Sequence, residues 1–116
     1  MKHLKKFNEA TNIDILKDIL LELEDMGIGS NFYSNKINRY IDIHGYNFQT
    51  IYWDDVKDCI LRLKKYLGKN YKQFIYGTFT HIKQGKYISA IDIGLELNED
   101  TYIGERIRHI TIIYTL

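Results

Sequence analysis

The chain has 116 residues, of which 45% are hydrophobic, and its 16 basic and 15 acidic residues leave a formal net charge of +1. This length supports one hydrophobic core, so we expect a single α+β domain over residues 1–116. The balanced charge excludes a protein that binds through overall basicity. A lone cysteine cannot form an internal disulfide, and neither a membrane helix nor a signal-peptide core is evident, so we expect a cytoplasmic protein without membrane contact.

The first part of the chain predicts a basic arm followed by an amphipathic helix. Residues 1–10 contain three lysines and are expected to form a partly ordered N-terminal arm. From Thr11 to Met26, apolar residues recur every three or four positions, which is the period of one helix face. Gly27 follows where a helix stop requires a left-handed residue.

Residues 28–43 change to the two-residue period of β-strands. Two short runs, 28–33 and 37–43, flank Ser34-Asn35-Lys36, a connection that is typical of a β-hairpin. The isoleucines of the second run should face the core.

The middle of the chain predicts a second helix, and the remainder predicts strands. Apolar residues follow a helical stripe from Val56 to Leu67, with Asp54 as the expected N-cap and Gly68 as the stop. Residues 71–83 and 86–97 alternate as strands around a Gln84-Gly85 turn, and residues 107–116 form a last, paired strand. The order α-β-β-α-β-β-β predicts a two-layer sandwich, with two helices on one face of a four- to five-stranded antiparallel sheet. This architecture resembles a permuted ferredoxin-like fold.

Charge is separated along the sequence. Residues 7–28 hold six carboxylates and one lysine. We expect the first helix to present an acidic, partner-binding face, against the alternative of a merely solvated face. Its members are Asp14, Asp18, Glu22 and Asp25.

Residues 59–91 contain seven cations, no acidic residue and several aromatic rings. Cations beside rings can bind single-stranded nucleic acid, because cations neutralise phosphates and rings stack on bases. The alternative is that half of the rings face the core and that the helix lysines only offset its dipole. The candidate nucleic-acid-binding residues are Arg62, Lys64, Lys65, Lys69, Lys72, Lys83, Lys86, Tyr71 and Tyr76.

One histidine motif admits an enzyme hypothesis. The strand segment His109-Ile110-Thr111-Ile112 is similar to the His-x-Thr motif of the 2H phosphoesterase superfamily, in which imidazoles act as acid and base. That family needs the motif twice, whereas His81 is followed by Lys83 and His44 by Tyr46 at the hydroxyl position. A reduced phosphoesterase is therefore an alternative, which burial of His109 away from His44 and His81 would exclude.

Other chemistry is not indicated. Cys59 lies on the apolar stripe of the second helix without a neighbouring ligand, so we expect a small core residue and no metal site. No complete catalytic set, phosphate-binding glycine loop or cofactor motif is present, and we expect no cofactor. An aromatic cluster precedes the second helix, and we interpret it as a cap on the core rather than a binding hot spot. It consists of Tyr46, Phe48, Ile51, Tyr52 and Trp53.

Three segments carry a resemblance. The stretches 1–9, 19–27 and 53–58 resemble small accessory proteins encoded by large tailed bacteriophages. The resemblance implies a viral protein that acts in the host cytoplasm by binding a host or viral macromolecule, such as an inhibitor of a host defence protein. It carries over no functional residue.

The leading hypothesis is therefore a non-enzymatic protein that binds another macromolecule, most simply a protein. The C-terminal run 110–116 is mostly apolar and contains few polar side chains that would keep another chain from pairing with it. An open sheet edge of this kind must be covered or paired. We accordingly expect a homodimer formed through an edge strand.

Overall fold

The computed structural model describes residues 2–79 and 92–115, and it describes side chains from residue 13 onward. In chain order the elements are α1 (Lys2–Glu24), β1 (Ile28–Ser34), β2 (Arg39–Gly45), η1 (Tyr46–Phe48), α2 (Trp53–Leu67), η2 (Gly68–Asn70), β3 (Tyr71–Thr78), β4 (Ile93–Leu95) and β5 (Ile107–Tyr114), where η marks a short 3-10 helix. The predicted order α-β-β-α-β-β-β is confirmed. The predicted Gln84-Gly85 turn lies outside the described residues.

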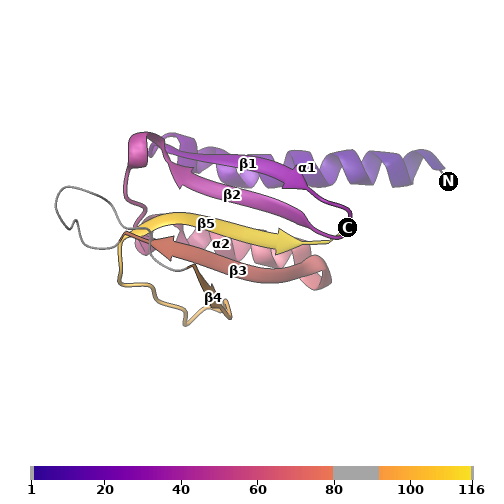
Figure 1. Ribbon diagram of the computed structural model, residues 1–116. Coiled ribbons are helices and arrows are strands. Elements are labelled where there is room, and N and C mark those ends of the chain that lie inside the picture. The colour runs from indigo at the N-terminus through magenta and orange to yellow at the C-terminus, as the bar shows by residue number, and fades with distance from the viewer. Residues whose placement is uncertain (1, 80–91, 116) are drawn as a thin grey trace.

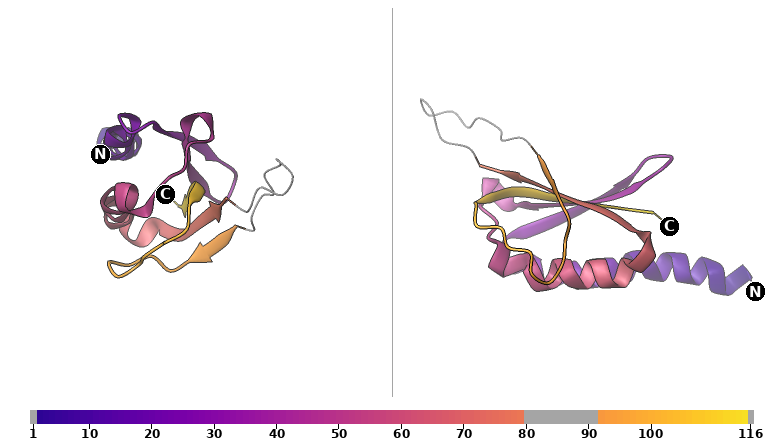
Figure 2. Two further views of the ribbon diagram at one scale, coloured as in Figure 1. Left: turned by 90° about the vertical axis from the view of Figure 1, so that its left-hand side faces the viewer. Right: turned by 90° about the horizontal axis from the view of Figure 1, so that it is seen from below.

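The strands form one antiparallel sheet in the order β1-β2-β5-β3-β4. Both helices cover the same face of this sheet, so the predicted two-layer α+β sandwich is confirmed (Figures 1 and 2). The arrangement is consistent with a permuted ferredoxin-like fold. We call the face without helices the open face.

The C-terminal strand lies in the middle of the sheet. β5 pairs with β2 on one side and with β3 on the other. It is therefore paired, as predicted, but it is not an edge. The prediction that this run offers an edge for homodimerisation is wrong, because two neighbouring strands already satisfy its backbone. The homodimer itself stays a prediction.

The first helix is longer than expected, because it includes the residues assigned to a basic arm. Residues 2–10 contain no glycine or proline, so nothing stops the helix from extending toward the N-terminus. Its N-terminal part projects beyond the sheet (Figure 1). At the other end, Gly27 has φ +78° and the Gly27 N–H donates to the Glu24 carbonyl, which confirms the predicted stop.

The first hairpin is confirmed, and Asn35 organises its turn. Asn35 Oδ1 accepts hydrogen bonds from the backbone N–H groups of Ile37 (2.9 Å) and Asn38 (2.7 Å). Ile41 and Ile43 of β2 are buried, as predicted, whereas Ile37 lies in the turn and is 75% exposed.

The core lies between the helices and the covered face of the sheet. α1 contributes Leu16, Leu20 and Leu23, and α2 contributes a stripe from Trp53 to Leu67. The stripe ends at Gly68, which has φ +54° as a stop requires. Asp54 is not the N-cap, because the helix begins one residue earlier and Asp54 lies in its first turn. Within the described residues, no helix is long and apolar enough to cross a membrane.

Candidate functional site

The predicted acidic face lies on the outer surface of α1. Asp14, Asp18, Glu22 and Asp25 are all exposed. The structure pairs Glu22 with Arg62 of α2, so one of the four charges is neutralised within the protein. The pKa of the Arg62 guanidinium is raised, mainly by this hydrogen bond.

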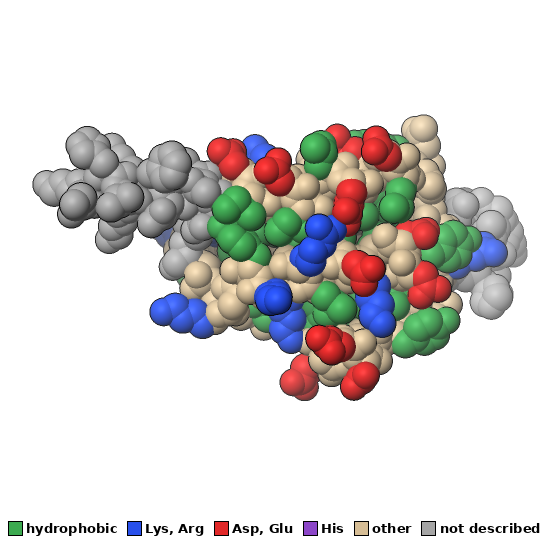
Figure 3. Space-filling view, turned by 180° about the vertical axis from the view of Figure 1, so that it is seen from behind, with side chains coloured by type: hydrophobic (Ala, Val, Ile, Leu, Met, Phe, Trp, Pro, Cys, Tyr) green, Lys and Arg blue, Asp and Glu red, His purple; other side chains and the backbone are tan. Residues whose placement is uncertain are grey.

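Helix packing extends the acidic surface in a way that the sequence did not reveal. The two helices run in opposite directions, because Leu16 of α1 lies near Leu67 at the end of α2, whereas Glu22, closer to the end of α1, pairs with Arg62, closer to the start of α2. The end of α1 therefore lies beside the start of α2, where Asp54 and Asp55 are exposed. Figure 3 shows the helix-bearing face, on which acidic side chains lie along the upper edge, at the right-hand end and at the lower edge, while basic side chains lie mainly across the middle.

The basic and aromatic residues predicted to bind nucleic acid do not share one face. Lys64 donates to the Leu97 carbonyl, and its ammonium lies 5.2 Å from the centre of the half-buried Tyr71 ring. Tyr76 is buried on the covered side of the sheet, and Lys72 donates to Asn38 Oδ1 at 2.8 Å. Lys65 and Lys69 are exposed on α2 and η2, and Lys83 and Lys86 lie outside the described residues.

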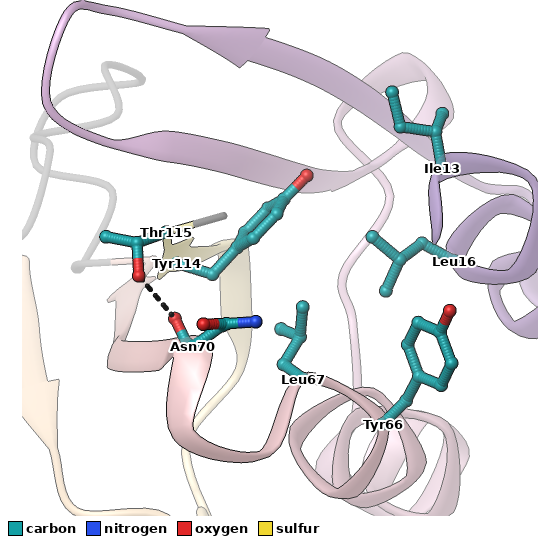
Figure 4. A pocket seen from close by; sticks show the side chains of 7 residues that line it. All are labelled: Ile13, Leu16, Tyr66, Leu67, Asn70, Tyr114 and Thr115. Atoms are coloured by element: carbon teal, nitrogen blue, oxygen red, sulfur yellow. Dashed lines mark hydrogen bonds between the residues drawn. The ribbon is translucent and has the colours of Figure 1, made fainter. Parts of the chain in front are cut away.

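A small pocket lies between the helices and the end of β5 (Figure 4). Leucine and isoleucine side chains line its helical walls, and Thr115 donates to the Asn70 carbonyl at its rim. The seven lining residues are Ile13, Leu16, Tyr66, Leu67, Asn70, Tyr114 and Thr115. They show no pair of groups arranged for catalysis, so the pocket is best understood as an incomplete closure of the core.

The aromatic cluster before α2 separates into a buried and an exposed half. Trp53 and Ile51 are buried, and Trp53 Nε1 donates to the Thr101 carbonyl at 2.9 Å, so the predicted core cap is confirmed for these two residues. Tyr46, Phe48 and Tyr52 are exposed instead.

The exposed half belongs to a larger surface at one end of the molecule. The Tyr46 N–H donates to the Gly27 carbonyl, and Gln49 Nε2 donates to the Met26 carbonyl, so η1 lies against the end of α1. The bond from Trp53 to Thr101 brings the exposed Tyr102 to the start of α2. We call this surface the apex, and define it by the exposed side chains Met26, Tyr46, Phe48, Tyr52 and Tyr102.

Phe48 stands out within the apex. Its backbone has φ +61° and that of its neighbour Asn47 has φ +54°. Left-handed backbone costs a bulky residue roughly 1–2 kcal/mol, and such strain often marks a functional site. The side chain is 84% exposed, so core packing does not explain why phenylalanine occupies this position.

A second cluster lies on the open face of the sheet, where strand pairing places two histidines side by side. His44 of β2 is the register partner of His109 of β5. Their outer neighbours in the same row are Gly29 of β1 and Gly77 of β3. His109 is therefore not packed in the core away from His44, while His81 lies outside the described residues. We call the four register partners Gly29, His44, His109 and Gly77 the histidine row.

A β-bulge shapes one side of the histidine row. The pairing of β3 with β5 shifts from Thr78 opposite Ile107 to Gly77 opposite His109, which leaves Arg108 as the extra residue. Both His109 and Arg108 contact Asp92: His109 Nε2 lies 2.9 Å and Arg108 Nη2 3.7 Å from Asp92 Oδ1.

Gly77 is required for this arrangement. A Cβ atom at Gly77 would lie 2.5 Å from His109 Nε2 and 2.8 Å from Asp92 Oδ1. Any other residue would therefore push the imidazole or the carboxylate away.

The other side of the histidine row holds His44 against Asp42 and Tyr46. His44 Nδ1 lies 3.8 Å from Asp42 Oδ2, too far for a hydrogen bond, and has no hydrogen-bond partner among the described residues. The rings of Tyr46 and His44 meet edge to face at 6.2 Å between centroids. Thr111, the hydroxyl of the sequence motif, lies one row away, between Asp42 and Ile75.

Metal and thiol chemistry receive no support from the described part of the chain. In that part, no group of three or more histidine, cysteine or acidic residues could hold a metal ion. Burial raises the pKa of the Cys59 thiol to about 12, and its Sγ lies 3.2 Å from the Ile19 carbonyl. The thiol is thus neutral and inaccessible, as expected for a core residue.

Comparisons of this chain with protein-family models, curated proteins and solved structures found no match.

The sequence pointed to Tyr46, Phe48 and Tyr52 as one cluster and to both histidines, but it did not predict that Met26 and Tyr102 would join the cluster or that His44 would pair with His109, because these groupings combine segments that are distant in the chain. One sequence feature pointed to the histidine row. The segment Ile41-Asp42-Ile43 recurs as Ile91-Asp92-Ile93, and in the structure Asp42 lies beside His44 and Asp92 beside His109.

Proposed function

We propose that this protein is a non-enzymatic binding module that attaches to a basic surface of another protein through its apex. The observation that carries the proposal is Phe48, a large apolar side chain presented to solvent on strained backbone. Aromatic residues dominate the energetics of protein interfaces, and they act best in groups that exclude water.

The surroundings of the apex support a basic partner. Asp25 directly precedes Met26, and Asp54 and Asp55 follow Tyr52. All three carboxylates are exposed at the rim of the aromatic surface. Rim charges of one sign favour partners of the opposite sign and accelerate their association. The resemblance to phage accessory proteins adds the expectation that the partner is a host protein in the bacterial cytoplasm, with inhibition of a defence protein as one outcome.

The test uses Phe48→Gly, because glycine tolerates positive φ. Removing the strain should stabilise the fold by about 1 kcal/mol, while removing the ring should weaken partner binding at least tenfold. A photo-crosslinking residue at position 48 identifies the partner in host extract, and titration of the purified partner gives the affinity. Ile37→Gly is the matched control, since Ile37 is equally apolar and exposed but lies in the hairpin turn.

Two outcomes would contradict the proposal. One is a partner whose affinity is unchanged by Phe48→Gly. The other is co-purification of single-stranded nucleic acid, with an affinity that falls steeply with salt and drops in Lys69→Glu. The second outcome would favour the nucleic-acid alternative. That alternative has less support, because Arg62 and Lys64 already bind groups within the protein.

A further inference from the structure

We propose that the histidine row, together with Arg108, is a proton-coupled binding site for a phosphate group on the open face of the sheet. Antiparallel partners place their Cβ atoms about 5 Å apart, so His44 and His109 project from adjacent positions on one face, with the His109 ring over Gly77 and the His44 ring beside Tyr46. Gly29 and Gly77 flank them, so no further side chain of the row separates them from Tyr46 on one side and Asp92 on the other.

The orientation of each ring indicates which nitrogen faces a ligand. His109 Nε2 forms a hydrogen bond with Asp92 Oδ1, which leaves His109 Nδ1 for another partner. His44 has the opposite arrangement: its Nδ1 is buried near Asp42, although 37% of the side chain is exposed, so its outward edge carries Nε2. The two rings therefore offer one nitrogen each.

Arg108 supplies a fixed positive charge beside the rings. The bulge places it next to His109, and its side chain is 37% exposed. Its Nε is buried without a hydrogen-bond partner among the described residues, so its ion pair with Asp92 leaves part of its donor capacity unused. A guanidinium and two imidazoles match the several acceptor oxygens of a phosphate group.

The charge of the site depends on protonation. With both imidazoles neutral, the charged groups facing the row are Arg108, Asp42 and Asp92, which sum to −1 and repel an anion. Protonation of both rings changes the sum to +1. Anion binding therefore favours the protonated rings, so the affinity for phosphate should be higher at lower pH.

The experiment follows the histidine ring resonances by NMR during titration with inorganic phosphate at pH 6 and pH 8. We expect saturable shifts of the His44 and His109 signals at pH 6 and binding at least tenfold weaker at pH 8. His44→Gln and His109→Gln should each reduce the pH dependence, whereas Arg108→Gln should weaken binding at both pH values. Arg106→Gln is the matched control, because it removes the same charge from an exposed position two residues away.

A second arm distinguishes the source of the phosphate. Uridine 5′-monophosphate and uridine are titrated in the same way. A nucleotide that binds more tightly than inorganic phosphate indicates a nucleotide site, and equal affinities indicate a site for the phosphate group alone; both support the proposal. Binding of uridine as tight as that of its phosphate, binding unaffected by all three substitutions, or no shift of either histidine at pH 6 would overturn it.

Discussion

Tyr71 shows how a single buried atom links stability to pH. Its hydroxyl has no hydrogen-bond partner among the described residues, and burial, with a smaller contribution from Glu96, raises its pKa to about 12 from the ordinary 10.0. As the pH rises toward 10, the unfolded chain begins to lose this proton while the folded chain retains it. The folded state is therefore progressively disfavoured between about pH 9 and pH 12, and stability is unaffected by this group below that window.

Tyr71→Phe should consequently stabilise the protein. At pH 7 we expect a gain of about 0.5–1 kcal/mol, because the substitution removes an unsatisfied buried hydroxyl and keeps the ring under Lys64. The advantage over the wild type should grow above pH 9, since phenylalanine cannot ionise. Urea denaturation at pH 7 and pH 10 measures both effects, with the exposed Tyr102→Phe as control. A loss of stability at pH 7 would show that the hydroxyl has a partner after all.

At the scale of elements, the turn between β1 and β2 depends on one side chain. Asn35→Ala removes two acceptor bonds to backbone N–H groups and should cost about 1–2 kcal/mol in urea denaturation. Asn35→Asp keeps both acceptors and loses only the Nδ2 bond to Tyr40, so it should recover most of that loss. Lys36→Ala, an exposed neighbour in the same turn, should have little effect. Equal destabilisation by Asn35→Asp and Asn35→Ala would contradict this account.

The elements themselves could largely be predicted from the sequence, because their signals are local. The α2 stripe and the stops at Gly27 and Gly68 depend only on neighbouring residues. The bulge at Arg108 could not be predicted, since it results from pairing with a strand about 30 residues earlier in the chain. The same limit applies to the meeting of His44 with His109, which requires both a strand partner and its register.

At the scale of the whole molecule, α1 makes the protein elongated. The radius of gyration is 15.3 Å, whereas a compact chain of this length has about 13 Å. The contribution of α1 to the described core begins at Leu16. Removal of residues 1–10 should therefore lower the radius of gyration by about 1–2 Å in small-angle scattering and shift Tm by less than about 3 °C. Leu16→Ala should instead cost about 2–4 kcal/mol. Loss of cooperative unfolding on truncation would contradict this division.

The net charge of +1 does not mean that charge is evenly distributed over the surface. The sequence already separates acidic from basic segments, and antiparallel packing of the helices then places the end of α1 beside the equally acidic start of α2. The near-zero total thus conceals an acidic region at the apex. The sequence could indicate the separation but not which of its charges would neutralise each other, as Arg62 and Glu22 do.

The central position of β5 has a consequence for how the protein is made. Among the described strands, β5 alone joins the pair β1-β2 to the pair β3-β4, and it is the last of the five to leave the ribosome. Until then, β1 can pair only with β2 and β3 only with β4, and each pair leaves unpaired the edge that β5 will occupy. Insertion of β5 closes both edges at once. The last strand therefore completes the sheet, and until it has paired, the exposed strand edges can form wrong contacts.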